Sequence, residues 1–185
     1  MPPVDWNWRE KARLVDIAQA RAAAAFDAFK RGGKTDEKRR AWELACASLE
    51  DAWQHAWPPT FWDALQSLGT SAQCDVSLLV AFLEADPMFF RSGYVAESIL
   101  RKLRRHALSE PMKARLRSVV LDAVRRRHRR QFRRFSSLAR DLDTPDLRRQ
   151  LEALAGSADA RVRTHATWVR ESLLQAERMR HRGGG

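Results

Sequence analysis

Guanidinium and ammonium groups are concentrated in one stretch of the chain, and arginine forks bind phosphate or carboxylate oxygens in pairs. Between Arg91 and Arg134 there are 15 Lys and Arg residues against 3 acidic residues, a formal charge of +12. The whole chain carries +11, so the remaining residues are together close to neutral. Concentrated positive charge attracts polyanions and accelerates their encounter. The sequence therefore favours a nucleic acid, DNA or RNA, or an acidic protein surface as the partner.

The densest part of this stretch places its arginines around one predicted helix. With about 100° per residue, Val124, Phe132 and Phe135 share the side that faces the core, and arginines cover the rest. Like charges four residues apart repel by about 0.2–0.5 kcal/mol per pair, and acidic residues that would compensate are almost absent. The pattern favours a polyanion-binding surface over a solvated helix, although arginine usage in a GC-rich genome gives the same composition. The candidate nucleic-acid-binding residues are Arg101, Lys102, Arg104, Arg105, Arg125, Arg126, Arg129, Arg130, Arg133 and Arg134.

Such a surface binds the phosphate backbone without recognising a base sequence, because long arginine side chains contact phosphates and not base edges. Six engaged arginines predict a log-log salt slope of about −5 on duplex DNA, at about 0.9 per phosphate. Phe132 and Phe135 fall on the apolar side, so they do not support a platform that stacks bases.

Six of the seven tryptophans lie in the first third of the chain. One interpretation is an aromatic core where three helices meet, with Trp42, Trp53 and Trp57 on one helix side. The other is a protein-docking groove, since Trp and Arg are enriched at interface hot spots. Trp6 and Trp8 lie near the N-terminus and are the pair predicted to be exposed, which makes them the candidate protein-binding residues.

No residue pattern indicates a reaction, a metal or a cofactor. The five histidines show no metal-binding spacing with one another or with the two cysteines, and His128 is expected in the core. The glycines lie at predicted helix ends without the spacing of a phosphate-binding loop. We predict a chain that is not an enzyme and has no cofactor or metal.

Length and composition indicate one soluble helical domain, residues 1–182, followed by a flexible tail at 183–185. The longest apolar run, Leu78 to Phe82, is far too short to cross a membrane. The N-terminus has no secretory pattern, so the cytoplasm is the expected compartment. Cys46 and Cys74 are expected to be buried thiols and not a disulfide.

Apolar residues recur at spacings of three and four throughout, which predicts an all-α protein of about eight helices. The first part, 1–85, is rich in tryptophan and holds four helices, with Leu14, Ile17 and Ala18 on the buried side of the first and the fourth fully enclosed. The predicted N-caps include Thr35, Thr60, Asp75, Ser109 and Thr144. The predicted helices cover about 6–30, 36–57, 61–68, 76–85, 92–106, 111–141, 147–155 and 159–179. The sixth continues unbroken unless it bends among the arginines.

The segment 145–179 resembles a HEAT-type helical repeat. Its second helix begins with Asp159, Val162, Arg163 and Ala166 in the spacing Asp-x-x-Val-Arg-x-x-Ala that is common in that family. The resemblance implies that the Asp and Arg form a ladder between neighbouring repeats, and that the Val and Ala pack in the core. It implies a short stack of HEAT-like helix pairs over 86–179, because one repeat cannot bury its apolar side alone. Some HEAT-like proteins are DNA-repair glycosylases, but no residue here matches such an active site.

Two functions remain open. The first is an accessory binding module that holds nucleic acid on the arginine surface. The second is an adaptor that docks an acidic or apolar protein partner, through the arginine surface or the tryptophan cluster, within a larger complex.

Overall fold

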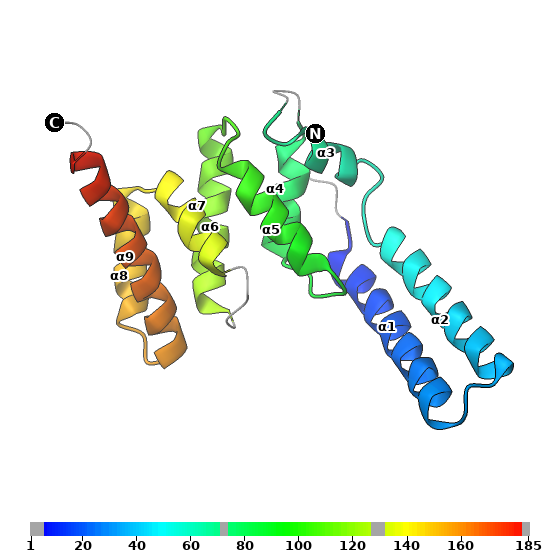
Figure 1. Cartoon of the computed structure of the whole chain (residues 1–185). Helices are drawn as coiled ribbons and strands as arrows, with labels where there is room; N and C mark the ends of the chain where they lie inside the picture. Colours follow the sequence, from blue (N-terminus) through cyan, green and yellow to red (C-terminus); the bar gives the residue numbers. More distant parts are fainter. Residues whose placement is uncertain (1–5, 71–73, 127–131, 183–185) are drawn as a thin grey trace.

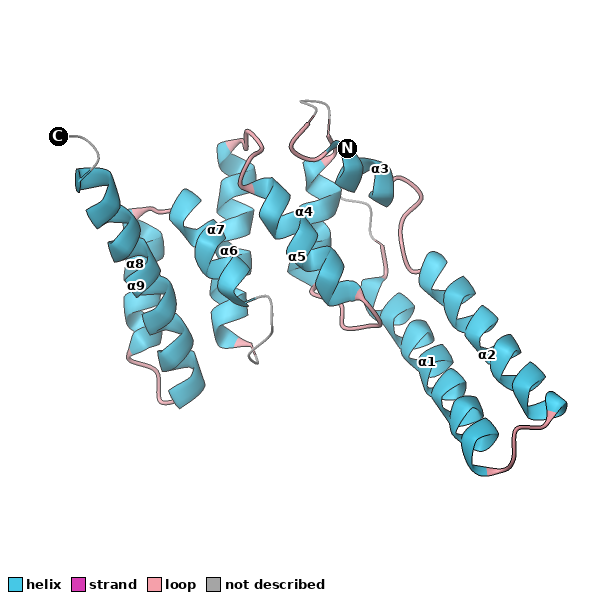
Figure 2. Cartoon of the chain, viewed as in Figure 1, coloured by secondary structure: helices cyan, strands magenta, loops and turns pink. Residues whose placement is uncertain are grey.

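A computed structural model describes residues 6–70, 74–126 and 132–182, and within these ranges the chain forms nine α-helices and no strand (Figure 2). The all-α prediction is therefore confirmed. The helices are α1 (Trp8–Arg31), α2 (Asp36–Gln54), α3 (Phe61–Ser67), α4 (Val76–Ala85), α5 (Ser92–Leu103), α6 (Glu110–Arg125), α7 (Phe132–Asp141), α8 (Pro145–Ala155) and α9 (Ala160–Arg182).

Local capping explains where several helices begin. Thr35, Asp75 and Thr144 occupy N-caps as predicted, and each side chain accepts a hydrogen bond from the backbone N–H three residues on. Thr60 and Ser109 also stand at N-caps, but their side chains make no such bond. Asp86 ends α4 in the left-handed conformation (φ 46°), which turns the chain sharply toward α5.

Of the two alternatives that the sequence leaves open for 111–141, an unbroken helix or a bend among the arginines, the structure shows an interruption among the arginines. Helix α6 ends at Arg125, where Arg126 becomes extended (ψ 174°), and a separate helix α7 starts at Phe132. A straight helix would carry the later apolar residues away from the protein. The break instead returns Phe132, Phe135 and Leu138 to the core, where all three are buried.

Helices α4 to α9 form three consecutive pairs that stand side by side (Figure 1). Helix α6 contacts α4 and α8 in one layer, and α7 contacts α5 and α9 in the other. Glu97 of α5 pairs with Arg134 of α7, and Arg104 at the C-cap of α5 pairs with Asp141 at the end of α7. Helices α5 and α7 therefore run in the same direction, as do α7 and α9, whose contacts join 132 to 168 and 136 to 172.

The tryptophans near the N-terminus belong to the core, so the prediction of an exposed Trp6 and Trp8 pair is wrong. Trp8 is only 5% exposed and packs on Phe82, with 5.1 Å between ring centroids. Trp6 is half-buried, and its Nε1 donates to the carbonyl of Ala56 at 2.9 Å. The aromatic-core interpretation holds for Trp57, which is buried in this cluster with Phe61, but not for Trp42, which packs on Phe26 and Phe29 of α1. Helix α4 is enclosed as predicted, with Leu78, Leu79, Val80, Phe82 and Leu83 buried.

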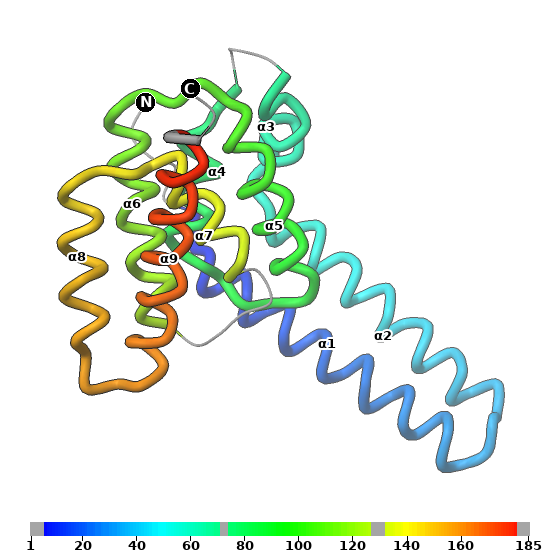
Figure 3. Tube along the Cα trace, turned by 60° about the vertical axis from the view of Figure 1, so that its left-hand side comes forward, coloured from blue at the N-terminus to red at the C-terminus, as the bar shows by residue number. Residues whose placement is uncertain are grey.

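Helices α1 and α2 form a hairpin that projects from the rest of the molecule (Figure 3). Helix α2 contains no fully buried residue, and Trp42 holds the far part of the hairpin by contacts with Phe26 and Phe29. The predicted buried side of α1 is partly wrong, because Leu14 and Ile17 are 44% and 40% exposed. Ala18 is buried as predicted, and Ala12 and Val15 are buried in place of Leu14 and Ile17.

The repeat-like segment packs partly as its resemblance implies. Val162 and Ala166 are buried. Asp159 and Arg163, however, make local contacts in place of the expected ladder: Asp159 accepts from the backbone N–H of Arg161 at 2.8 Å, and Arg163 donates to the carbonyls of Ser157 and Ala158. Both residues therefore stabilise the loop before α9. Membership of the HEAT family remains a proposal.

Candidate functional site

Two of the predicted arginines join α5 to α7 by ion pairs. Arg134 lies 2.9 Å from Glu97, and Arg104 lies 2.6 Å from Asp141. In both pairs the acid belongs to the neighbouring helix, so the absence of acids on the same helix does not leave these charges uncompensated. Arg104 and Arg134 therefore fix the register of two parallel helices, and their charge is largely neutralised.

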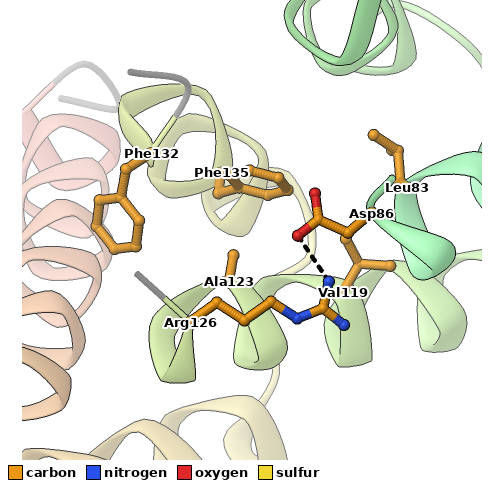
Figure 4. Close-up of a pocket in the computed structure, with 7 residues that line it drawn as sticks. All are labelled: Leu83, Asp86, Val119, Ala123, Arg126, Phe132 and Phe135. Carbon is orange, nitrogen blue, oxygen red and sulfur yellow. Dashed lines mark hydrogen bonds and ion pairs between the residues drawn. The ribbon is translucent and has the colours of Figure 1, made fainter. Parts of the chain in front are cut away.

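Arg126 closes a small cavity at the junction of α4, α6 and α7. Its Nη1 lies 2.7 Å from Oδ2 of Asp86, and Figure 4 shows this pair next to Phe135. Leu83, Val119, Ala123 and Phe132 complete the lining of a space of about 20 Å³, enough for one water molecule. Arg125 pairs with Asp122 on its own helix at 3.2 Å. Both arginines thus have intramolecular partners, and the cavity is too small for a ligand.

Lys102 points away from the other cations and toward α3. Its Nζ donates to the carbonyls of Leu65 and Gln66, at 2.7 and 3.3 Å. These carbonyls lie in the last turn of α3, where a positive charge also interacts favourably with the helix dipole. Lys102 therefore ties α5 to the tryptophan-rich part.

A second set of arginines has no acidic partner. Arg101 on α5, Arg105 in the turn just after α5, and Arg133 and Arg140 on α7 form no ion pair with the residues that the structure describes. Arg101 and Arg133 lie on the sides of their helices opposite the buried residues, so they face the same outer surface of the layer. Arg129 and Arg130 fall outside the described residues. We call the four arginines the unpaired set.

A cleft runs between α7 and α9 on this outer surface. Its first compartment, about 540 Å³, is lined by Phe132, Arg133, Ser136, Ser137, Arg140, Trp168, Glu171, Ser172 and Gln175. Its second compartment, about 530 Å³, is lined by Arg104, Arg140, Asp141, Gln175, Ala176, Met179 and Arg180. Arg140 and Gln175 line both compartments, so the two lie next to each other along α7, from its start to the ends of α5 and α7.

Sequence reasoning missed Trp168, Arg140 and Arg180 as cleft residues. Trp168 is 46% exposed, and it lies off the buried stripe of α9 that Ala166, Val169 and Leu173 form. A large aromatic residue outside such a stripe is a signal that the sequence contains. The proximity of Trp168 to Arg133 and Arg140 is a tertiary feature, so only the packing of α7 on α9 shows it.

An ion-pair network closes the far end of the stack. Asp143, between α7 and α8, accepts from Nε and Nη2 of Arg148 at 2.8 and 2.7 Å, and Arg180 of α9 lies 3.6 Å away. Arg148 also pairs with Glu177 at 3.0 Å. The hydrogen bonds from Arg148 lower the pKa of Asp143 and raise that of Arg148 itself. This network attaches α9 to the start of α8.

The described residues contain no group of three or more His, Cys, Asp or Glu side chains that could hold a metal ion. His165 is 3% exposed, stacks on Phe132, and has its Nδ1 at 3.2 Å from the carbonyl of Val124. Burial and the neighbouring Asp75 raise the pKa of the half-buried Cys74 thiol, which donates to the carbonyl of Ala64. This environment favours the thiol over the reactive thiolate. The other cysteine, Cys46, is also a half-buried free thiol.

Comparison of the chain with protein-family models, curated proteins and solved structures finds no match. None of the helices in the described ranges combines the length and apolar character needed to cross a membrane.

Proposed function

We propose that this chain is a non-enzymatic helical-repeat module, an accessory subunit that binds the phosphate backbone of nucleic acid through the outer surface of the α5–α7–α9 layer. The observation that carries the proposal is the unpaired set: three arginines on the adjacent parallel helices α5 and α7 and a fourth, Arg105, just past the end of α5, without acidic partners among the described residues. The absence of an acidic partner among the described residues selects a smaller set of binding residues than the sequence predicted. Arg101, Arg105 and Arg133 are retained, and Arg140 is added.

Electrostatics support this choice over the other predicted cations. A phosphate that approaches Arg104 or Arg134 must compete with a carboxylate less than 3 Å away. The unpaired arginines face no such competition, and their planar forks suit bidentate contact with phosphate. Backbone contacts of this kind predict binding without sequence specificity.

Electrophoretic shift of random-sequence duplex across a salt series tests the proposal. Four engaged arginines predict a log-log slope of about −3.6, at about 0.9 per phosphate, which is shallower than six would give. The combined reversal Arg101→Glu, Arg105→Glu and Arg133→Glu should abolish the shift. Arg126 is unsuitable for reversal, because a glutamate there would face Asp86.

The control is Arg21→Glu with Arg40→Glu on the projecting hairpin, which reverses charge away from the proposed surface. Both are exposed arginines without ion pairs in the described part of the chain. The control should leave the shift close to wild type. Binding that survives the triple reversal, or that the control abolishes equally, would refute the assignment of this surface.

The second candidate is a protein adaptor, and the projecting hairpin is the observation that favours it. Leu44 is 70% exposed on α2, and Leu14 and Ile17 are also exposed on α1. Exposed apolar residues on a protruding element are typical of protein-docking sites. A stoichiometric partner that stays bound after nuclease treatment and is lost in Ile17→Asp with Leu44→Asp would support this function; loss of all bound material to nuclease would count against it.

A further inference from the structure

We infer that the α7–α9 cleft binds a single-stranded segment of nucleic acid, with a base stacked on Trp168 and the backbone held by Arg133 and Arg140. This inference rests on the proposed function and specifies its ligand. The juxtaposition of an exposed indole with two unpaired guanidinium groups in one cleft is its basis.

The spacing of the two arginines suits a nucleic-acid strand. Arg133 and Arg140 are seven residues apart on α7, which places them on the same side of the helix and about 10.5 Å apart along its axis. In a stacked strand each nucleotide advances about 3.4 Å, so this distance corresponds to about three steps. Two phosphates of one short segment can therefore be held at once.

Trp168 is placed to receive a base. Its ring is supported from the core side by Phe132 and His165, with ring centroids 6.0 and 5.8 Å away. Both supporting side chains are buried, whereas nearly half of Trp168 remains exposed at the cleft. Base stacking requires an aromatic ring that is fixed in position and partly exposed to solvent. Such stacking does not depend on which base is bound.

The remaining lining residues give the cleft a net positive charge. The cleft is lined by four cations, Arg104, Arg133, Arg140 and Arg180, and by the acids Asp141 and Glu171. Arg104 is paired with Asp141 and Arg180 with Asp143, so the cations without an ion pair among the described residues are Arg133 and Arg140. Arg140 donates to Oγ of Ser137 at 3.1 Å, while its buried Nε has no hydrogen-bond partner among the described residues. The ligand is therefore anionic, and the hydroxyl groups of the lining serines add polar contacts.

A single strand fits this cleft better than a duplex for two reasons. Each compartment has the volume of a small-molecule pocket, which accommodates a few nucleotides and not a double helix. The bases of a duplex are stacked on each other, so only an unpaired base can stack on a protein ring. Phe132 and Phe135 are buried, as predicted, and Trp168 alone among these rings is exposed.

Fluorescence anisotropy with a labelled oligothymidylate and the matching duplex tests the inference on the full chain. Trp168→Leu keeps an apolar side chain but removes the ring, and should weaken single-strand binding about tenfold or more, with duplex binding unchanged. Trp168→Tyr should stay close to wild type. Leu174→Ala is the control, because Leu174 is 44% exposed on the same helix but does not line the cleft.

The outcomes separate this inference from the proposed function. Equal binding of the strand by Trp168→Leu and the wild type would overturn the inference, and the proposed function would stand if the triple arginine reversal still abolished binding. Equal affinity for strand and duplex would also overturn it. Failure of both probes to bind would overturn both proposals. Thermal unfolding by circular dichroism confirms that each variant is folded.

Discussion

Asp143 is the residue at which ionisation and stability are most directly linked. Its side chain is 12% exposed, and Arg148 donates two hydrogen bonds to it. These bonds lower its pKa below the value of about 3.9 of an unfolded chain. A carboxyl group with a lowered folded pKa contributes stability that is present above pH of about 4 and is lost as the pH falls below it.

We therefore expect Asp143→Asn to lower the free energy of unfolding by about 1–3 kcal/mol at neutral pH, because Arg148 loses its paired acceptors. The difference from wild type should shrink as the pH falls below about 4 and through the lowered pKa of Asp143, where the folded wild-type carboxyl also becomes protonated. Urea unfolding at neutral and acidic pH measures this. Asp27→Asn, which breaks an exposed pair with Arg31, should have little effect at either pH. A constant difference across this pH range would show that the pair does not act through ionisation.

Single helices were largely predictable from the sequence, whereas relations between helices were not. Thr35, Asp75 and Thr144 cap helices as predicted, because a cap depends only on residues three positions apart. The sequence left the break after Arg125 as an open alternative, since Phe132 and Phe135 keep the apolar period of α6 and periodicity alone cannot locate a gap.

The charges of the candidate site could also not be predicted from one helix at a time. A helical wheel of the arginine stretch shows few acids, but Glu97 of α5 pairs with Arg134 of α7, and Asp141 of α7 pairs with Arg104 at the end of α5. Each partner is separated from its arginine by 37 residues. Only the parallel packing of α5 on α7 divides the arginines into paired and unpaired ones.

The projecting hairpin should be the least stable element. Helix α2 has no fully buried residue, whereas half of the residues of α4 are buried. Hydrogen exchange should therefore be about tenfold or more faster in the far part of α1–α2 than in α4. Trp42→Ala removes the contacts with Phe26 and Phe29, so it should accelerate exchange in the hairpin only. Equal acceleration in α4 and α6 would indicate that the hairpin unfolds together with the stack.

For the whole molecule, some arginines are ion-paired and others belong to the unpaired set. We therefore expect that substitutions can change nucleic-acid binding and folding stability separately. The pair Arg101→Gln and Arg133→Gln removes unpaired charges, and the pair Arg104→Gln and Arg134→Gln removes the links between α5 and α7. Both lower the net charge from +11 to +9, so any effect of total charge is the same in the two variants.

The first variant should lose about tenfold or more in affinity for nucleic acid, because two phosphate contacts disappear, with its free energy of unfolding within about 0.5 kcal/mol of wild type. The second should lose about 0.5–2 kcal/mol of stability, since two half-exposed ion pairs break, and should retain most of its affinity. Urea unfolding and anisotropy titration at one salt concentration measure both quantities. Equal losses of affinity in the two folded variants would mean that total charge governs binding, and that the pairing seen in the structure does not select the binding arginines.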